Sequence, residues 1–342
     1  MRTARVKPVA AESPVGGTYY HLVNRIAGFP GDFPFGDREK ERFIQLMKQL
    51  LRLYTIEPVA WMVMGNHFHI LAFAPATAPS PVETARRYEA YYNGKRWLEP
   101  ASEKCLRTAR RMIDISLFMR DLQFQFSGWF NRSRPVRRRG RLWGDRFKSA
   151  ILEGPGGVWE CLKYVTLNPV RAKLVTDPAD YRFSAWGEWN GTGAAPYAAS
   201  LLRHLRHSFG ERAATWEFAD FHRELRSEFA RVRTAETHAL PDDIEKAMAE
   251  AAMEPALLGV LNRRVRYWTD GLVIGSSAFL PKVMNEFLPA AAIARHRPGP
   301  KSVPTGVVAP PAHGQLRVAA LLPPASPVPE LRAWRRLRIQ QT

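Results

Sequence analysis

Two histidines one residue apart, His67 and His69, could supply two ligands to a divalent metal ion. They lie in the stretch Val59–Ala74, VAWMVMGNHFHILAFA, which is typical of two apolar β-strands joined at Gly65-Asn66. We expect a two-residue turn there, with glycine where a primed turn needs a positive φ. Because strand side chains alternate, both imidazoles would project from one face of the hairpin. The alternative to a metal site is an exposed polar face.

A tyrosine and an asparagine, Tyr164 and Asn168, lie four residues apart in a second short segment. The apolar residues around them recur at the spacing of a helix, at Val158, Cys161, Leu162 and Val165. This helix would follow the chain breaker Gly154–Gly157 and end at Pro169, because the residue before a proline is displaced from the α region. Tyr164 and Asn168 would then lie one turn apart on its flank. On the residues alone, they are either site residues or a core-edge tyrosine and a helix cap.

The run Arg132–Lys148, RSRPVRRRGRLWGDRFK, holds eight lysines and arginines and one acid, Asp145. Arginine makes bidentate contacts with phosphate, so this run favours a nucleic-acid backbone as partner. Trp143 and Phe147 lie among the charges and could stack on unpaired bases. The alternative is a solvated loop that leads into a strand over Arg141–Leu152, with both aromatic side chains in the core.

The composition of the whole chain agrees with a polyanion as partner. The 342 residues carry a formal net charge of +18 and a pI near 10.3, although solvated surface charge alone would give the same values. Two cysteines, Cys105 and Cys161, provide neither a disulfide framework nor a zinc-knuckle spacing, which suits a reducing cytoplasm. No apolar run has membrane-spanning length and no signal-peptide pattern occurs, so we expect an intracellular protein without a membrane segment.

The order of the expected elements is strand, helix, hairpin, helices, strand, helix. A first strand is expected over Gly17–Asn24, an amphipathic helix over Asp37–Tyr54 with Asp37 as N-cap, and two or more helices over residues 83–131. This order predicts an α+β fold, a ferredoxin-like antiparallel sheet with helices on one face.

Domain boundaries follow from shifts in composition. We expect a flexible arm over residues 1–15, a main domain over 16–191 and a helical extension over 192–290. Beyond residue 291 proline and glycine become frequent and large apolar residues become rare, so 291–342 is expected to be a disordered tail.

Five motifs together carry a resemblance that none carries alone. In chain order they are YYHLVNR (19–25), MGNHFHIL (64–71), RRGRLWGDRFKS (138–149), YVTLNPVRAKLV (164–175) and DYRFSAW (180–186). This set resembles the REP-associated tyrosine transposases, a branch of the single-tyrosine HUH nucleases, over about residues 17–191. Two departures are Gly65, where the family usually has proline, and a long insertion around residues 78–112.

The resemblance implies a site and a reaction. His67, His69 and Asn168 would bind Mg²⁺ or Mn²⁺, and Tyr164 would attack a phosphate of single-stranded or hairpin DNA to form a 5′-phosphotyrosine. The new bond stores the energy of the broken one, so strand transfer needs no nucleotide cofactor. Two imidazoles and one amide favour Mn²⁺ over Mg²⁺. Because the imidazoles must be neutral to bind a metal, activity would fall below a pH of about 6.

The candidate DNA-binding side chains are the basic groups of the run and its neighbours: Arg25, Arg137, Arg138, Arg139, Arg141, Arg146, Lys148 and Arg171. His21 and Asn24, on the first expected strand, would lie close to the site with either a functional or a packing role. The expected location is the cytoplasm, in association with the nucleoid, and the sequence leaves open a monomer or a homodimer. Two other functions remain: a non-catalytic nucleic-acid-binding regulator derived from a transposase, and a metal-dependent hydrolase that acts through bound water.

Overall fold

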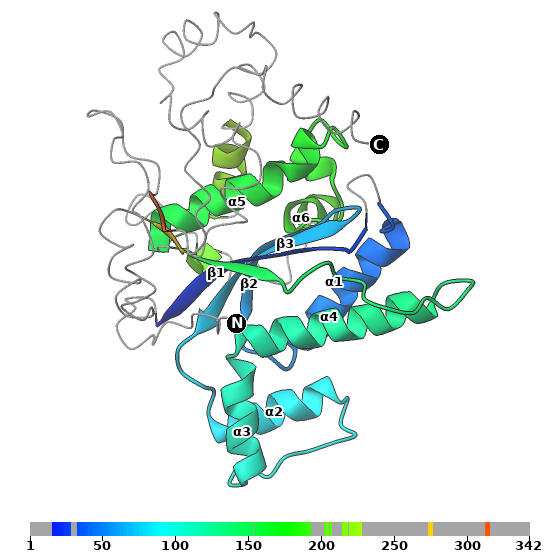
Figure 1. Cartoon of the computed structure of the whole chain (residues 1–342). Helices are drawn as coiled ribbons and strands as arrows, with labels where there is room; N and C mark the ends of the chain where they lie inside the picture. Colours follow the sequence, from blue (N-terminus) through cyan, green and yellow to red (C-terminus); the bar gives the residue numbers. More distant parts are fainter. Residues whose placement is uncertain are drawn as a thin grey trace, which may run out of the picture.

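The centre of the protein is an antiparallel sheet of four strands (Figure 1). The computed structural model describes residues 16–28, 33–152, 154–192, 202–204, 206, 214–217, 219–227, 273–275 and 312–314. The strand order is β2-β3-β1-β4, with bounds Gly17–Arg25 for β1, Glu57–Val63 for β2, His67–Pro75 for β3 and Lys148–Leu152 for β4. The first strand and the hairpin agree with the sequence-based prediction, whereas β4 is shorter than the strand expected over Arg141–Leu152.

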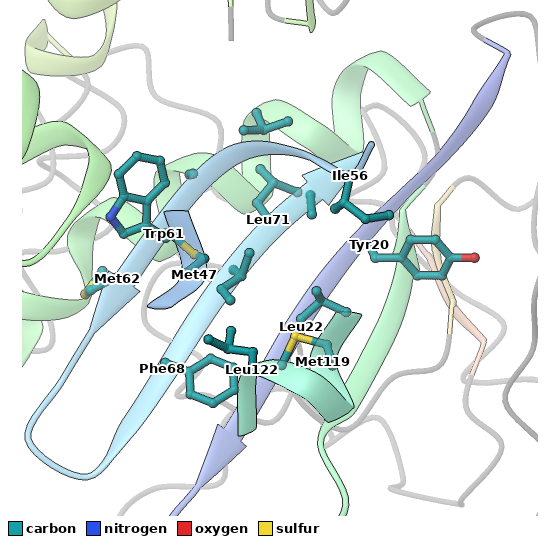
Figure 2. Packing of buried hydrophobic residues seen from close by; sticks show 14 of the residues in the cluster. Tyr20, Leu22, Met47, Ile56, Trp61, Met62, Phe68, Leu71, Met119 and Leu122 are labelled. Atoms are coloured by element: carbon teal, nitrogen blue, oxygen red, sulfur yellow. The ribbon is translucent and has the colours of Figure 1, made fainter. Parts of the chain in front are cut away.

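Two crossover connections, from β1 to β2 and from β3 to β4, each contain a helix, and both helices lie on the same face of the sheet. α1 (Asp37–Leu51) follows β1, and α4 (Ile115–Arg132) precedes β4. The ring centroids of Phe43 on α1 and Phe68 on β3 are 4.7 Å apart. Figure 2 shows apolar side chains packed between α4 and the sheet, among them Leu22, Phe68, Met119 and Leu122. This strand order, with both crossover helices on one face, is the ferredoxin-like α+β arrangement that the sequence predicts.

A further helix covers the opposite face, which the sequence did not predict. α5 (Gly154–Arg171) places Tyr164 against His69 of β3, whereas α1 packs on Phe68, the preceding residue of the same strand. Neighbouring strand residues point to opposite faces, so the sheet lies between two helical layers. Residues 68–74 of β3 are accordingly all buried. The expectation of helices on one face therefore holds for the crossover helices only.

The apolar positions of α5 are buried as predicted, but both predicted ends of this helix are wrong. α5 begins within the Gly-Pro-Gly-Gly segment and runs through Pro169 to Arg171. A proline inside a helix lacks one backbone donor and crowds the preceding turn, yet beyond Pro169 the helical bonding resumes, because Ala172 N donates to Asn168 O at 2.9 Å. The helix ends where Lys173 adopts a φ of 57°, the left-handed conformation of a helix C-terminus. Asn168 is therefore held in helical backbone instead of a frayed end.

The N-cap of α1 also differs from the prediction. Gly36, instead of Asp37, is the cap residue, and its backbone N–H donates to the Glu39 carboxylate at 2.9 Å. Asp37 is then the first helical residue, where its charge still favours the positive end of the helix dipole. The helix ends at Leu51, short of the expected Tyr54.

The hairpin turn spans Gly65 and Asn66 as predicted, because Met64 N donates to His67 O at 2.8 Å. Neither turn residue has a positive φ, so the predicted primed turn is wrong. The two carbonyls of the turn instead accept backbone N–H groups from neighbouring chain, at 2.9 Å for Gly65 O and 3.0 Å for Asn66 O. These bonds hold the turn, and with it the start of β3, in place.

The insertion between β3 and α4 forms two helices, α2 (Pro81–Tyr91) and α3 (Glu103–Met112), beside α4 (Figure 1). Gln125 of α4 donates to the hydroxyl of Tyr91 at 3.3 Å. Arg111 of α3 forms an ion pair with Asp121 of α4. The helical pieces expected over residues 83–131 are therefore three, counting α4.

Two three-residue strands continue the sheet beyond β4. β5 (Val273–Gly275) is parallel to β4, and β6 (Ala312–Gly314) is antiparallel to β5. α6 (Ala185–Thr192) follows α5 and spans the expected domain boundary at residue 191. The arm over 1–15 and most of the ranges 192–290 and 291–342 lie outside the described residues. Where the chain is described, no helix is both long enough and apolar enough to cross a bilayer.

Candidate active site

Three histidines meet on the face of the sheet that α5 covers. His67 and His69 share this face as predicted, with ring centroids 5.1 Å apart. His21 of β1 stacks on His69, with centroids 5.1 Å apart and planes 5° from parallel. Nε2 of His21 lies 2.9 Å from Nδ1 of His69, a hydrogen bond between two buried rings. His21 therefore fixes the orientation of the His69 ring.

Tyr164 lies over this group from α5. Its ring centroid is 5.5 Å from that of His69 and 5.8 Å from that of His21, edge to face in both contacts. The position follows from the sequence pattern, because Tyr164 adjoins the apolar stripe of α5 and that stripe packs on the sheet. We call His21, His67, His69 and Tyr164 the histidine–tyrosine cluster.

Burial favours the neutral forms of His67, His69 and Tyr164. It lowers the pKa of His67 to about 4, with a smaller contribution from the charge of Arg25, and it lowers the pKa of His69 well below its usual value. Burial also raises the pKa of Tyr164 to about 12, against the opposing charge of Arg171. The imidazoles are therefore neutral, as metal binding requires. Without a metal they stay neutral below the pH of about 6 at which the sequence placed the loss of activity.

Two ring nitrogens, one on His67 and one on His69, are candidate ligands for a divalent metal ion. Nδ1 of His67 donates to the side-chain oxygen of Asn66 at 2.7 Å, which leaves Nε2 of His67 as a lone-pair donor. Nε2 of His69 is buried, and among the described residues it has no hydrogen-bond partner. Asn168 donates its amide nitrogen to the Tyr164 carbonyl at 3.0 Å, so its side-chain oxygen remains for another partner.

This donor set would consist of two imidazole nitrogens and one amide oxygen. In the part of the chain that the structure describes, no group of three His, Cys, Asp or Glu side chains suits a metal. His67, His69 and Asn168 would therefore need oxygens of a substrate or water to complete the coordination of Mn²⁺ or Mg²⁺.

Cationic side chains surround the cluster. Arg25 pairs with His67 in the register of β1 and β3. Lys148 of β4 lies in the same row as His69, with Val23 of β1 between them. The guanidinium carbon of Arg171 lies 5.2 Å from the centre of the tyrosine ring, and its Nη1 donates to the tyrosine carbonyl at 3.3 Å. These three predicted DNA-binding residues are thus brought to the site, where their charge favours an anion.

The other predicted DNA-binding residues lie in the loop of residues 133–147, the basic loop. Arg137, Arg139, Arg141 and Arg146 are exposed, and none of the four forms an ion pair with another described residue. Arg138 differs, because its guanidinium donates to the side-chain oxygen of Asn131 at 3.3 Å and to the carbonyl of Arg141 at 3.0 Å. It holds the loop together, while its exposed neighbours remain available to a phosphate backbone.

The two aromatic side chains of the basic loop pack toward the core, Phe147 within it and Trp143 against it. The Trp143 ring lies 5.4 Å from Phe68 and 5.9 Å from Phe126, and Phe147 is buried. The hypothesis of base stacking is wrong for Phe147, because its buried ring is removed from solvent and from any bound strand. Trp143 is partly buried and packs against the core, which favours the alternative considered for the sequence, aromatic side chains in the core under a solvated loop.

The roles of His21 and Asn24 are visible only in the structure. Asn24 donates its amide to the carbonyl of Asp145 at 3.0 Å and so ties the basic loop to the end of β1. His21 binds His69, 48 residues away in sequence. Strand alternation alone places His21 and Arg25 on one face, but the register that brings His21 to His69 is not contained in that pattern.

Comparisons with known proteins identify no family for this chain. No protein-family model matches the chain, and no curated protein matches it. Among solved structures, the chain is similar to the "Structure of the REP associates tyrosine transposase bound to a REP hairpin" at 17% identity and a TM-score of 0.35. The match covers 58% of this chain and 88% of that one. This is a distant likeness in fold, and the site has to be interpreted from its own geometry.

Proposed function

We propose that the protein cleaves and rejoins single-stranded DNA through Tyr164, with a divalent metal ion bound at His67 and His69. The observation that carries this proposal is the contact of the tyrosine ring with His69, whose outer nitrogen is buried and without a hydrogen-bond partner among the described residues. A tyrosine hydroxyl, a pair of neutral imidazoles and surrounding cations together suit nucleophilic attack on a phosphate diester.

In the proposed step, the Tyr164 oxygen attacks a backbone phosphorus and the bond from phosphorus to the 3′-oxygen breaks. The products are a 5′-phosphotyrosine and a strand with a free 3′-hydroxyl, which takes up the proton that the phenol loses. Because the pKa of Tyr164 is raised to about 12, this proton has to leave during the attack and not before it. Reversal by the same or another 3′-hydroxyl rejoins the strand, with no nucleotide cofactor.

The metal site and the cations have separate tasks. A Mg²⁺ or Mn²⁺ ion held by His67, His69 and Asn168 would supply Lewis-acid polarisation of the phosphate oxygens. Arg25, Lys148 and Arg171 would neutralise the phosphate charge from the sides of the site. Arg137, Arg139, Arg141 and Arg146 would hold the flanking backbone, which gives single-stranded or hairpin DNA as partner.

The burial of Tyr164 adds a condition to the proposal. Its side chain is 3% exposed, and a nucleophile has to contact the phosphorus that it attacks. The side of the sheet covered by α5 must therefore open when DNA binds, by a movement of α5 relative to β1 and β3.

The test is incubation of the protein with end-labelled single-stranded and hairpin DNA and Mn²⁺ or Mg²⁺, followed by a denaturing gel. We expect a labelled protein–DNA adduct that is absent for Tyr164→Phe. Tyr20→Phe is the matched control, since Tyr20 is equally buried at 3% exposure but belongs to β1 and lies on the face of α1 and α4.

The outcomes separate the competing functions. DNA binding without adduct or cut strand for any substrate would contradict the proposal and favour a binding protein. Cleavage that persists in Tyr164→Phe would also contradict it, in favour of hydrolysis through bound water.

A further inference from the structure

The loop between α2 and α3 presents a tryptophan to solvent. Trp97 is 71% exposed, and the two residues before it, Lys95 and Arg96, are exposed as well. Tryptophan is the side chain with the largest apolar area, and exposed tryptophans are typical of contact sites more than of inert surface. This segment lies in the insertion of residues 78–112, to which the proposed cleavage site assigns no role.

The chain on both sides of Trp97 is anchored to the rest of the protein. Asn93 and Gly94 adopt positive φ angles of 52° and 75°, and Gly94 N donates to Glu89 O at 3.0 Å. Arg52, which follows α1, donates to the side chain of Asn93 at 3.2 Å. Leu98, directly after the tryptophan, is buried. Because the residues on both sides are anchored, the fold itself keeps Trp97 exposed to solvent.

The charge next to Trp97 is positive. Among the described residues neither Lys95 nor Arg96 forms an ion pair, and the guanidinium carbon of Arg96 lies 4.6 Å from the centre of the Tyr92 ring. The nearest acid along the chain, Glu99, exerts its charge on the thiol of Cys105 and raises its pKa, second to the effect of burial. An aromatic face beside two unpaired cations is the combination that binds bases and phosphates of a single strand.

We propose that the segment Lys95–Trp97 is a second contact site for single-stranded nucleic acid, with a base stacked on Trp97 and phosphates bound by Lys95 and Arg96. This inference rests on the proposed function, because it takes DNA as the substrate. α2 and α3 lie on the far side of α4 from α5 (Figure 1). The strand bound at Trp97 is therefore a part of the DNA different from the one at Tyr164.

Another exposed aromatic side chain provides a matched control. Phe124 of α4 is 78% exposed, close to the value for Trp97. The cation one turn before it, Arg120, is paired with Asp121 at 3.1 Å. Phe124 therefore offers a ring of comparable exposure without an unpaired cation beside it, and we expect no nucleic-acid contact there.

The experiment measures binding of full-length protein to fluorescently labelled oligothymidine by anisotropy, in the Tyr164→Phe background so that no adduct forms. Trp97→Ala should weaken binding about fivefold or more, as expected for the loss of one stacked base. Trp97→Phe should retain most of the affinity and Phe124→Ala all of it. The melting temperatures of these variants should equal that of the parent protein, since Trp97 is exposed and its loss removes no core packing.

Each outcome has a defined meaning. If the parent protein binds oligothymidine and Trp97→Ala binds as tightly, this inference is wrong while the proposed function stands. If the parent binds no DNA of any kind, both are wrong. If Trp97→Ala changes the sedimentation of the free protein but not its affinity for oligothymidine, the tryptophan is a protein–protein contact and the inference is likewise wrong.

Discussion

The histidine–tyrosine cluster and the basic loop are held in opposite ways. The cluster is set by strand register and helix packing, and three of its four members are at most 3% exposed. The exposed arginines of the basic loop have no ion-pair partners among the described residues, although Arg138 and Asn24 fix the backbone beneath them. Under the proposed function, catalysis and most of the DNA affinity would be located in separable parts of one domain. Substitutions should therefore affect them differently.

The largest effect is expected for His69→Gln. Its outer nitrogen is buried and has no hydrogen-bond partner among the described residues, so the substitution would remove the proposed metal ligand. We expect a fall in metal-dependent cleavage greater than the roughly 100-fold seen for residues that only orient a ligand. Isothermal titration calorimetry with Mn²⁺ measures the loss of metal affinity, and a cleavage assay measures the loss of activity.

A second buried histidine on the same face controls for this substitution. His204 binds the Tyr19 hydroxyl at 2.8 Å through Nδ1 and lies outside the cluster. His204→Gln should leave Mn²⁺ binding unchanged. Equal losses in the two variants would mean that the cluster is only a packed part of the core.

A smaller effect is expected for His21→Gln, which disrupts the 2.9 Å contact with His69 but leaves both proposed ligand nitrogens in place. Metal affinity should fall by about 10- to 100-fold. Melting of the metal-free protein, followed beside Mn²⁺ titration, separates this role from packing. A lower melting temperature with unchanged Mn²⁺ affinity would show that His21 has a structural role only.

The smallest effect is expected in the basic loop. Arg137→Ala with Arg139→Ala should weaken DNA binding several-fold and reduce the slope of log affinity against log salt by about 0.7 for each lost phosphate contact. Adduct formation at saturating DNA should be nearly unchanged. Alanine at Arg86 and Arg107, which are exposed but paired with Glu83 and Glu103, is the matched control. An unchanged salt slope in the first variant would exclude these two arginines from the interface.

Much of the fold can be predicted from the sequence, because it depends on local periodicity. Alternation along the hairpin places His67 and His69 on one face, and the helical spacing from Val158 to Val165 gives the buried stripe of α5. The order of these elements along the chain then predicts the ferredoxin-like sheet. Local rules failed where tertiary contacts override them, as at Pro169, which α5 passes through, and at the Gly65 turn, which is held by neighbouring chain.

Less of the candidate site than of the fold can be predicted from the sequence. The contact of His21 with His69 depends on the pairing of β1 with β3, which no local pattern specifies. Trp143 shows the converse difficulty, because a tryptophan among arginines has the composition of a nucleic-acid contact, and only the structure reveals its packing on Phe68 and Phe126. Burial, which decides between these interpretations, is a property of the whole fold.

The most direct test of the account is to identify the residue that becomes attached to DNA. The adduct formed with a hairpin or single-stranded substrate in Mn²⁺ would be digested with nuclease and protease and analysed by mass spectrometry. We predict a nucleotide joined through its 5′-phosphate to the peptide that contains Tyr164. Attachment to any other tyrosine would contradict the assignment of the nucleophile and, with it, the function proposed for the histidine–tyrosine cluster.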